Sequence, residues 1–457
     1  MKIYVLIGII LFLIQSATGK DGILENYISE GLDNNLALKQ KEFSLKKSIY
    51  ELREARGKFL PSISIEGRYS RAGGGRTIEF PVGDLMNPVY NAINATRLEA
   101  GQQPFNFPVL ENEVIPFLRE EEQETKIRAT QMIFQPALFY NEKIKSDLKS
   151  IREYDVNIYK RQLISEIKTA YLNYLKLEQV KRLYTSTLDL LKENLRVSEK
   201  LVENDKATRE VIYRAQTELS KIEQELEEAK ANSTQAQYYF NHLLNRPLQD
   251  TIKVENNLTL LDPGNENTDA YIQSTLANRE ELKQLKETIE VARHVKGAAG
   301  SAFLPGIFVV GDYGYQGEQY NFTSDYDYWM VSGILQWNLF NGFQDHSKRQ
   351  QAQMDENKAN LVLQETEKLL TMQVQKSYDN LQVAAKARIT SEERLRAARE
   401  SFKIINKKYS EGLASQIEFI DAHNSLTSAE IGRIINQYDY YIRAAELERV
   451  AALWIFE

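Results

Sequence analysis

A duplicated junction constrains the fold of this chain more than any other feature of its sequence. The segment "GKFLPSIS" at Gly57–Ser64 returns as "SAFLPGIF" at Ser301–Phe308. Aligning the two Leu-Pro pairs gives an offset of 244 residues (304 − 60), and further along the offset becomes 207 (378 − 171), which brings Tyr171 onto Tyr378. Because the matches keep the same order along the chain, we infer a duplicated unit rather than chance identity.

Each copy has the same predicted order of elements: helix, strand, loop, strand, very long helix, tight turn and long helix. Alternation of apolar and polar residues predicts strands near 61–70 and 125–135, and again near 305–316 and 326–340, each with one apolar face. Aromatic residues stand near the ends of the second pair: Tyr313, Tyr315, Tyr326, Tyr328, Trp329 and Trp337. This pattern fits either amphipathic hairpins on a soluble core or the aromatic girdle of a lipid-exposed barrel.

The segments after the strands predict two long helical hairpins, at 137–246 and 343–454. Their apolar residues recur at spacings of three, four or seven, which is typical of a coiled-coil seam. A helix from about Ala137 to Asn204 would be about 100 Å long at 1.5 Å per residue, longer than a globular domain requires. At the turns, Gly412 is expected to supply a positive φ, and Asp205 takes its place in the first copy.

The chain begins with the features of an export signal. Lys2 precedes the apolar run Val5–Ile14, and Ala17 and Gly19 supply the small residues of a cleavage site. We therefore predict a signal peptide at 1–19, with an uncleaved anchor as the alternative, a first repeat at 20–265 and a second repeat at 266–457. No later segment has the roughly 20 consecutive apolar residues of a transmembrane helix.

Composition excludes several classes of function. The formal net charge is -7, and a nucleic-acid partner would require a basic surface, so none is expected. The chain has no cysteine, which excludes disulfides, thiolate metal sites and a lipidated N-terminal cysteine. The stretch Arg71–Glu124 carries glycine and proline and is interpreted as a long loop, whereas the second copy has only a short loop near Gln316–Asp325.

The duplicated plan, the FLP strand entries and two further motifs resemble the TolC-type outer-membrane efflux family. These motifs are "QWNLFNGF" at Gln336–Phe343 and "KYSEGLASQIEFIDAHNSL" at Lys408–Leu426, and the resemblance covers essentially the whole mature chain. It implies a homotrimer in the outer membrane, with a 12-stranded β-barrel continued by an α-helical periplasmic tunnel. It also implies two partners, a periplasmic adaptor protein and an inner-membrane pump of the RND or ABC type.

The resemblance assigns roles to residues near the second turn. Glu418 and Asp421, three apart on one helix face, match the acidic residues at the narrowed periplasmic entrance, and Tyr409 matches a tyrosine that helps to latch it. A solvated helix face is the plainer interpretation. The chain also departs from the family pattern, because Ala414 replaces a basic residue and the first copy lacks the acidic pair.

Two further groups of residues receive roles from the same resemblance. Pro61 and Pro305 are expected where helix gives way to strand, since proline lacks an amide donor and disfavours helix before it. Small and polar residues at the turns match the tips that meet a periplasmic adaptor in the family: Asp205, Ala207, Thr208, Gly412, Ala414 and Ser415. The requirements of a tight turn alone would also explain these residues.

Catalysis has no support in the sequence. The four histidines are far apart and are interpreted as solvated helix residues: His242, His294, His346 and His423. The sequence has no phosphate-binding loop, nucleophile elbow or zinc motif. We expect no cofactor and no metal site. The leading hypothesis is a passive exit duct; the alternatives are a periplasmic coiled-coil adaptor and a helical enzyme. Whether drugs, metals or proteins would pass remains open, because the pump largely decides this.

Overall fold

The computed structural model describes residues 22–254, 267–454 and 456. The predicted signal peptide at 1–19 lies outside the described residues. The chain divides into two compact units. One comprises Met1–Tyr50, Ile144–Arg293 and Gln353–Glu457, and its described residues are mostly helical; the other comprises Glu51–Lys143 and His294–Ala352 and contains the strands.

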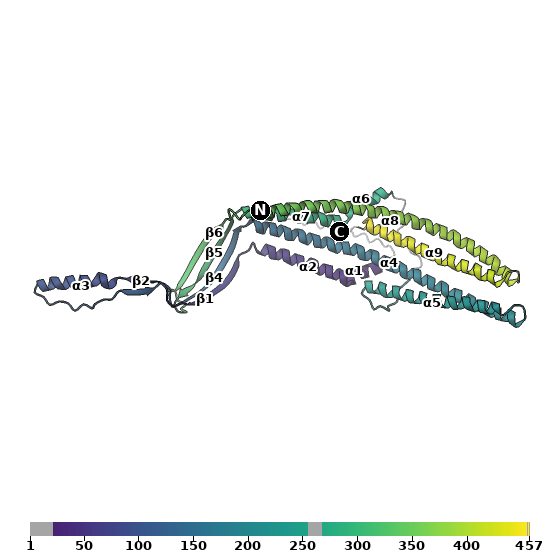
Figure 1. Cartoon of the computed structure of the whole chain (residues 1–457), viewed down its shortest axis with the longest axis horizontal. Coiled ribbons are helices and arrows are strands. Elements are labelled where there is room, and N and C mark those ends of the chain that lie inside the picture. The colour runs from purple at the N-terminus through teal and green to yellow at the C-terminus, as the bar shows by residue number, and fades with distance from the viewer. Residues whose placement is uncertain (1–21, 255–266, 455, 457) are drawn as a thin grey trace, which may run out of the picture. The chain divides into compact units, whose positions relative to one another are not determined.

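The elements follow one another along the chain in two series of the same order (Figure 1). The first series is α1 (Ile23–Asn34), α2 (Leu36–Gly57), β1 (Ser62–Arg71), β4 (Glu121–Phe134), α4 (Pro136–Glu203) and α5 (Glu210–Leu243). The second is α6 (Thr268–Asn278), α7 (Glu280–Gly300), β5 (Gly306–Gly317), β6 (Asp327–Gln336), α8 (Gln344–Ser410) and α9 (Gln416–Val450), with a short 3₁₀ turn at Ser301–Phe303.

The two series agree element by element, which confirms the duplicated unit. The break between α1 and α2 falls at Asn35, with φ −59° and ψ 124°. The break between α6 and α7 falls at Arg279, 244 residues later, with φ −60° and ψ 123°. The long helices α4 and α8 have 68 and 67 residues, and α5 and α9 have 34 and 35.

The strands of the two copies form one antiparallel sheet in the order β1-β4-β5-β6. One row of paired residues crosses all four strands: Ile65, Ile127, Tyr313 and Trp329. Ile65 and Trp329 are 77% and 76% exposed. The predicted alternation is therefore confirmed, and the sheet has an apolar face that nothing else in the described part of the chain covers.

The opposite face of the sheet carries a network of charged side chains. Arg128 of β4 donates two hydrogen bonds of 2.8 Å to the carboxylate of Asp312 in β5. A second ion pair of 3.3 Å joins Arg128 to Glu66 of β1, and the Tyr328 hydroxyl of β6 donates to Glu124 at 2.6 Å. Contacts on this face thus link side chains of all four strands.

The stretch between β1 and β4 is not the loop that its glycines and prolines suggested. It contains β2 (Thr77–Phe80), the helix α3 (Val82–Glu99) and β3 (Glu113–Pro116), and β2 pairs with β3. The chain returns from α3 to β3 through a segment that contains Phe105 and Leu110. The side chain of Asn87 donates to and accepts from the backbone of Leu110, and that of Asn94 does the same with Phe105. These long-range contacts stabilise a helix around Pro88, so tertiary packing outweighs the local propensity that favours a loop.

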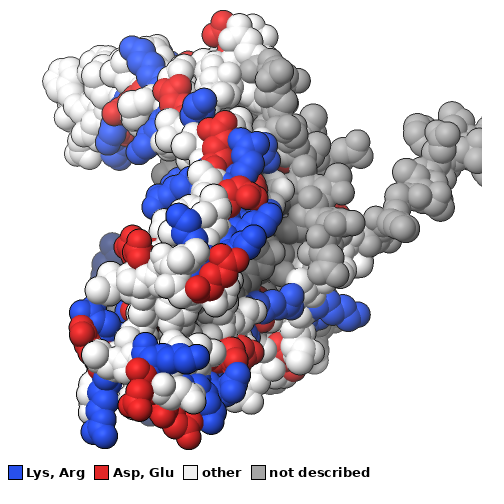
Figure 2. Space-filling view, turned by 90° about the vertical axis from the view of Figure 1, so that its right-hand side faces the viewer, with Lys and Arg blue, Asp and Glu red and all other residues white. Residues whose placement is uncertain are grey.

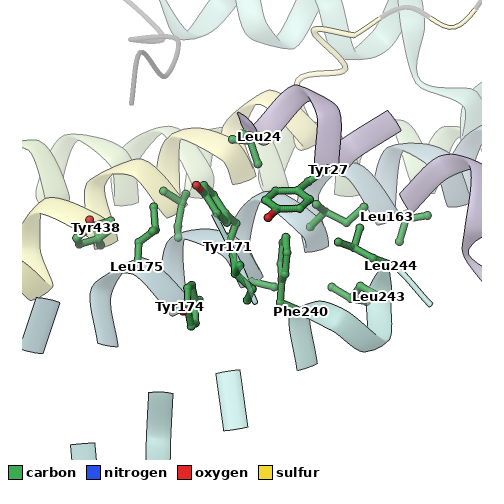
Figure 3. Packing of buried hydrophobic residues seen from close by; sticks show 14 of the residues in the cluster. Leu24, Tyr27, Leu163, Tyr171, Tyr174, Leu175, Phe240, Leu243, Leu244 and Tyr438 are labelled. Carbon is green, nitrogen blue, oxygen red and sulfur yellow. The ribbon is translucent and has the colours of Figure 1, made fainter. Parts of the chain in front are cut away.

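The core of the helical unit lies where α1, α4, α5 and α9 meet (Figure 3). The Tyr27 ring packs edge-on against Phe240, with centroids 5.0 Å apart, and lies 5.7 Å from the ring of Tyr171. Buried ion pairs flank this core: Arg161 of α4 donates to both oxygens of Glu280 at 2.7 and 2.9 Å. Such a pair is costly to break from one side, because the remaining charge is left buried.

Candidate functional site at the two hairpin turns

The turns that join α4 to α5 and α8 to α9 have the same backbone geometry. Asp205 has a φ of 57° and Gly412, 207 residues later, a φ of 76°. In each turn the next residue donates a backbone hydrogen bond of 2.8 Å to a carbonyl five residues before it: Lys206 to Leu201, and Leu413 to Lys408. The positive φ predicted at both positions is confirmed.

The residues assigned to the tips are accessible, or partly so, on the single chain. Asp205, Thr208, Gly412 and Ser415 are exposed, while Ala207 and Ala414 are half-buried. Ser415 is also the N-cap of α9, since its side chain accepts a hydrogen bond from the Glu418 amide. Whether the tips meet an adaptor stays a prediction.

Glu418 is held by the start of its own helix. Its carboxylate accepts hydrogen bonds from the Ser415 backbone at 2.7 Å and the Ser415 hydroxyl at 2.8 Å, which completes a capping box. These bonds, with a smaller contribution from Lys408, lower the pKa of Glu418. Asp421 is exposed one turn further along α9. The two carboxylates thus lie near each other, but they differ in how firmly they are held.

Tyr409 stacks on an aromatic cluster between α8 and α9. Its ring centroid lies 4.8 Å from that of Phe419, which is itself 5.7 Å from Phe402. The His423 ring lies 5.7 Å from Phe402 and continues the cluster. Tyr409 therefore packs within its own hairpin, and its role as an entrance latch stays a prediction.

The interpretation of all four histidines as solvated is wrong for His423, which is 4% exposed. The buried stripe at the start of α9 runs through Gln416, Phe419, His423 and Thr427, whereas Ala422 and Leu426 are only half-buried. Burial lowers the pKa of His423, and the nearby Glu218 carboxylate partly opposes this. The sequence misled because two polar residues occupy positions of the packing stripe.

Gln416 joins the two hairpins, and the sequence did not single it out. Its side-chain amide donates to the Val211 carbonyl of α5 at 2.7 Å and to the Ser198 hydroxyl of α4 at 3.2 Å. Gln416 is 6% exposed, and its bond to Ser198 is buried while its bond to Val211 is partly buried. The sequence could have indicated this role through spacing, because a residue three positions before Phe419 lies on the same buried side of α9.

The two prolines occupy equivalent places in the unit that contains the strands. Pro61 directly precedes β1 and Pro305 directly precedes β5, outside any helix. Just before them, the Leu60 amide donates to the Gly57 carbonyl and the Leu304 amide to the Ser301 carbonyl, both at 3.0 Å. Both junctions therefore end the preceding helix with the same hydrogen bond.

The charges near the turns are mixed rather than concentrated. Figure 2 looks onto the side of the molecule where both turns lie, and acidic and basic side chains are interspersed there. Among the described residues, no group of acidic or histidine side chains has an arrangement that could hold a metal ion. Nor does any described helix have the length and apolar character needed to cross a membrane.

Part of the chain matches a known family model. The family model for outer membrane efflux proteins matches residues 271–452. No sequence among curated proteins matches the chain.

Solved structures match nearly the whole chain. A membrane protein from Pseudomonas aeruginosa is 17% identical, with a TM-score of 0.77 and 94% of each chain covered. The Campylobacter jejuni CmeC outer membrane channel is 14% identical, with a TM-score of 0.75 over 94% of this chain and 85% of CmeC. The Vibrio cholerae outer membrane protein VceC is 14% identical, with a TM-score of 0.75 over 95% and 97%. The resemblance to TolC-type outer-membrane efflux proteins is therefore confirmed, in the sequence over residues 271–452 and in the fold over nearly the whole chain.

Proposed function

We propose that this protein is the passive outer-membrane exit duct of a tripartite efflux or type I secretion system. The observation that carries the proposal is the four-stranded sheet, which has one charged face, one exposed apolar face and two outer strands. Within the described residues, β1 and β6 each pair with a single neighbour. An open sheet edge in lipid leaves backbone donors and acceptors without partners, which costs several kcal/mol for each group.

Closure with further copies of the chain resolves this cost. Three copies, each with four strands, give a 12-stranded barrel in which β1 of one copy pairs with β6 of the next. The row that contains Ile65 and Trp329 then faces lipid, and the Arg128–Asp312 pair faces the lumen, as in other membrane barrels with polar interiors.

The remaining assignments come from the sequence and its resemblance to the efflux family. We assign a signal peptide to 1–19 and the two repeats to 20–265 and 266–457, with the hairpins extending into the periplasm as a trimeric tunnel. At its entrance Glu418 and Asp421 form the acidic ring, and Tyr409 helps to close it. The small residues at the two turns meet a periplasmic adaptor, which connects the duct to an inner-membrane pump of the RND or ABC type.

The main alternative is a water-soluble coiled-coil adaptor without a barrel. The sheet argues against it, because a soluble protein would cover side chains such as Trp329 and Ile65, which are here more than three-quarters exposed. An enzyme is a weaker candidate still, since the matched family and the similar solved structures named above are membrane channels and membrane proteins.

Fractionation and mass measurement test the proposal. The protein should remain with the outer membrane, require detergent for extraction, and have the mass of three chains in native mass spectrometry. Cysteine substitution then fixes the orientation, since the chain has no cysteine of its own. An impermeant reagent should label Gly74→Cys on intact cells but not Gly412→Cys. A soluble monomer, or the opposite labelling pattern, would refute the proposal.

A further inference from the structure

The segment between β1 and β4 carries a helix that the proposed duct does not use. Its two-stranded base continues the β1–β4 pairing: the Ala72 amide donates to the Glu120 carbonyl, and the Phe117 amide to the Arg76 carbonyl, both at 2.9 Å. Beyond them β2 pairs with β3. The helix α3 is therefore tethered to the end of β1 that lies away from Pro61.

One side of α3 packs on the returning segment through two asparagines and an aromatic stack. Asn87 exchanges hydrogen bonds of 2.8 and 3.0 Å with the backbone of Leu110, and Asn94 exchanges bonds of 2.9 and 2.8 Å with the backbone of Phe105. At the start of the helix, a Cβ on Gly83 would lie 2.2 Å from the Leu110 carbonyl oxygen. The close approach and the paired asparagines fix which side of α3 faces the returning segment.

The opposite side of α3 is apolar and exposed. Leu85, Val89 and Ile93 are 66%, 47% and 39% exposed, and Val89 and Ile93 line a shallow groove together with Ala92 and Thr96. Leu85, Val89, Ala92 and Thr96 are spaced by four, three and four residues, which is the spacing of a coiled-coil seam. A lone surface helix would place these residues inward, so the stripe is arranged for a partner.

The charges on α3 narrow the choice of partner. Between Val82 and Glu99 the helix has no lysine, and its one arginine, Arg97, donates to the Gln103 carbonyl at 3.0 Å and lies over the Phe105 ring. Helices that lie on anionic lipid present several lysines or arginines beside the apolar stripe. The stripe instead has the sparse charge and small central residues that permit close approach of another helix.

We propose that the α3 helices of three copies pack through this stripe as a parallel bundle at the outer end of the duct. This inference rests on the proposed trimer, in which three tethers bring three stripes to the same end of one barrel at a high effective concentration. Helices in contact have axes about 8–10 Å apart, so a three-helix bundle leaves no wide passage between them. The bundle would therefore link the protomers and constrict the exit.

Disulfide trapping in the purified full-length trimer tests the inference. Ala92→Cys lies on the stripe, and Asn91→Cys is an exposed control about 100° away around the same helix. On mild oxidation Ala92→Cys should give a severalfold higher yield of covalent dimer than Asn91→Cys. Equal yields, or none, in a trimer of normal mass would overturn the inference and leave the duct intact.

Two further outcomes separate the possible errors. If native mass spectrometry finds no trimer in either variant, the proposed duct fails and the bundle fails with it. A spin label on Ala92→Cys tests whether lipid, rather than another helix, contacts the stripe. If a lipid-soluble relaxation agent broadens the EPR spectrum of the label and neighbouring labels do not, lipid covers α3 and the bundle is overturned. Strong broadening between labels, lost when Asn91→Cys is labelled instead, supports it.

Discussion

Replacing Gln416 by alanine should loosen the start of α9 from the first hairpin without unfolding the chain. The substitution removes a 2.7 Å hydrogen bond to the Val211 carbonyl and a 3.2 Å bond to the Ser198 hydroxyl. Leaving a buried acceptor unsatisfied costs about 1–3 kcal/mol, but Val211 is only half-buried, and the Ser198 hydroxyl keeps a partner because it donates to the Asn194 carbonyl. The Gln416 side-chain oxygen is itself buried without a hydrogen bond among the described residues, and its removal offsets part of the loss.

These contributions leave a net cost of about 1 kcal/mol, which is about a fivefold increase in local opening. Hydrogen exchange measured by mass spectrometry should show amides near 416–423 exchanging about fivefold faster, while the core near Tyr171 is unchanged. Ile417→Ala is the matched control, because Ile417 is 55% exposed on the same turn. If Gln416→Ala exchanges no faster than Ile417→Ala, the two hydrogen bonds do not hold the hairpins together.

Three further substitutions test other parts of the structure. Asp421→Ala should weaken cation selectivity and multivalent-cation block in reconstituted channels, with Glu393→Ala as an inactive control; equal effects would return Asp421 to a solvated face. Burial lowers the pKa of His423, so the unfolded chain binds a proton at this imidazole more tightly than the folded chain does. The free energy of unfolding should therefore be highest above the ordinary histidine pKa of 6.5 and should decrease as the pH falls below it. In His423→Phe the slope of melting temperature against pH in this range should flatten, and an unchanged slope would contradict the assignment. Glu280→Ala should cost about 3–5 kcal/mol, since it leaves the buried Arg161 charge unpaired; a loss below 1 kcal/mol by denaturant titration would show that water reaches the site.

The sequence predicted the parts of the fold that local chemistry decides. Order and spacing were enough to place the strands, the long helices and the two turns, because Gly412 and Asp205 tolerate the conformation that a reversal requires. Pro61 and Pro305 directly precede β1 and β5 for a similar reason, since proline acts on its own backbone and on the residue before it.

The features that sequence reasoning missed depend on contacts between distant residues. Helix α3 forms around Pro88 because Asn87 and Asn94 bind a segment that returns more than ten residues later. His423 was interpreted as solvated because it is polar, and Gln416 was not singled out, yet both lie on the buried stripe of α9. In each of these places a polar side chain does the packing, which a pattern of apolar residues does not reveal.

Ion conductance across a planar lipid bilayer tests the central claim most directly. The purified, full-length trimer should insert and give discrete conductance steps of uniform size that need neither ATP nor an adaptor, because the lumen of a closed barrel is continuous with water. Steps from a cation-selective pore that become less selective in Asp421→Ala would further support the assignment of the entrance. A trimer of correct mass that inserts into the bilayer but gives no conductance, even after the helix tips are loosened by Gln416→Ala and residues 82–99 are deleted from the outer end, would contradict the account of this protein as a duct.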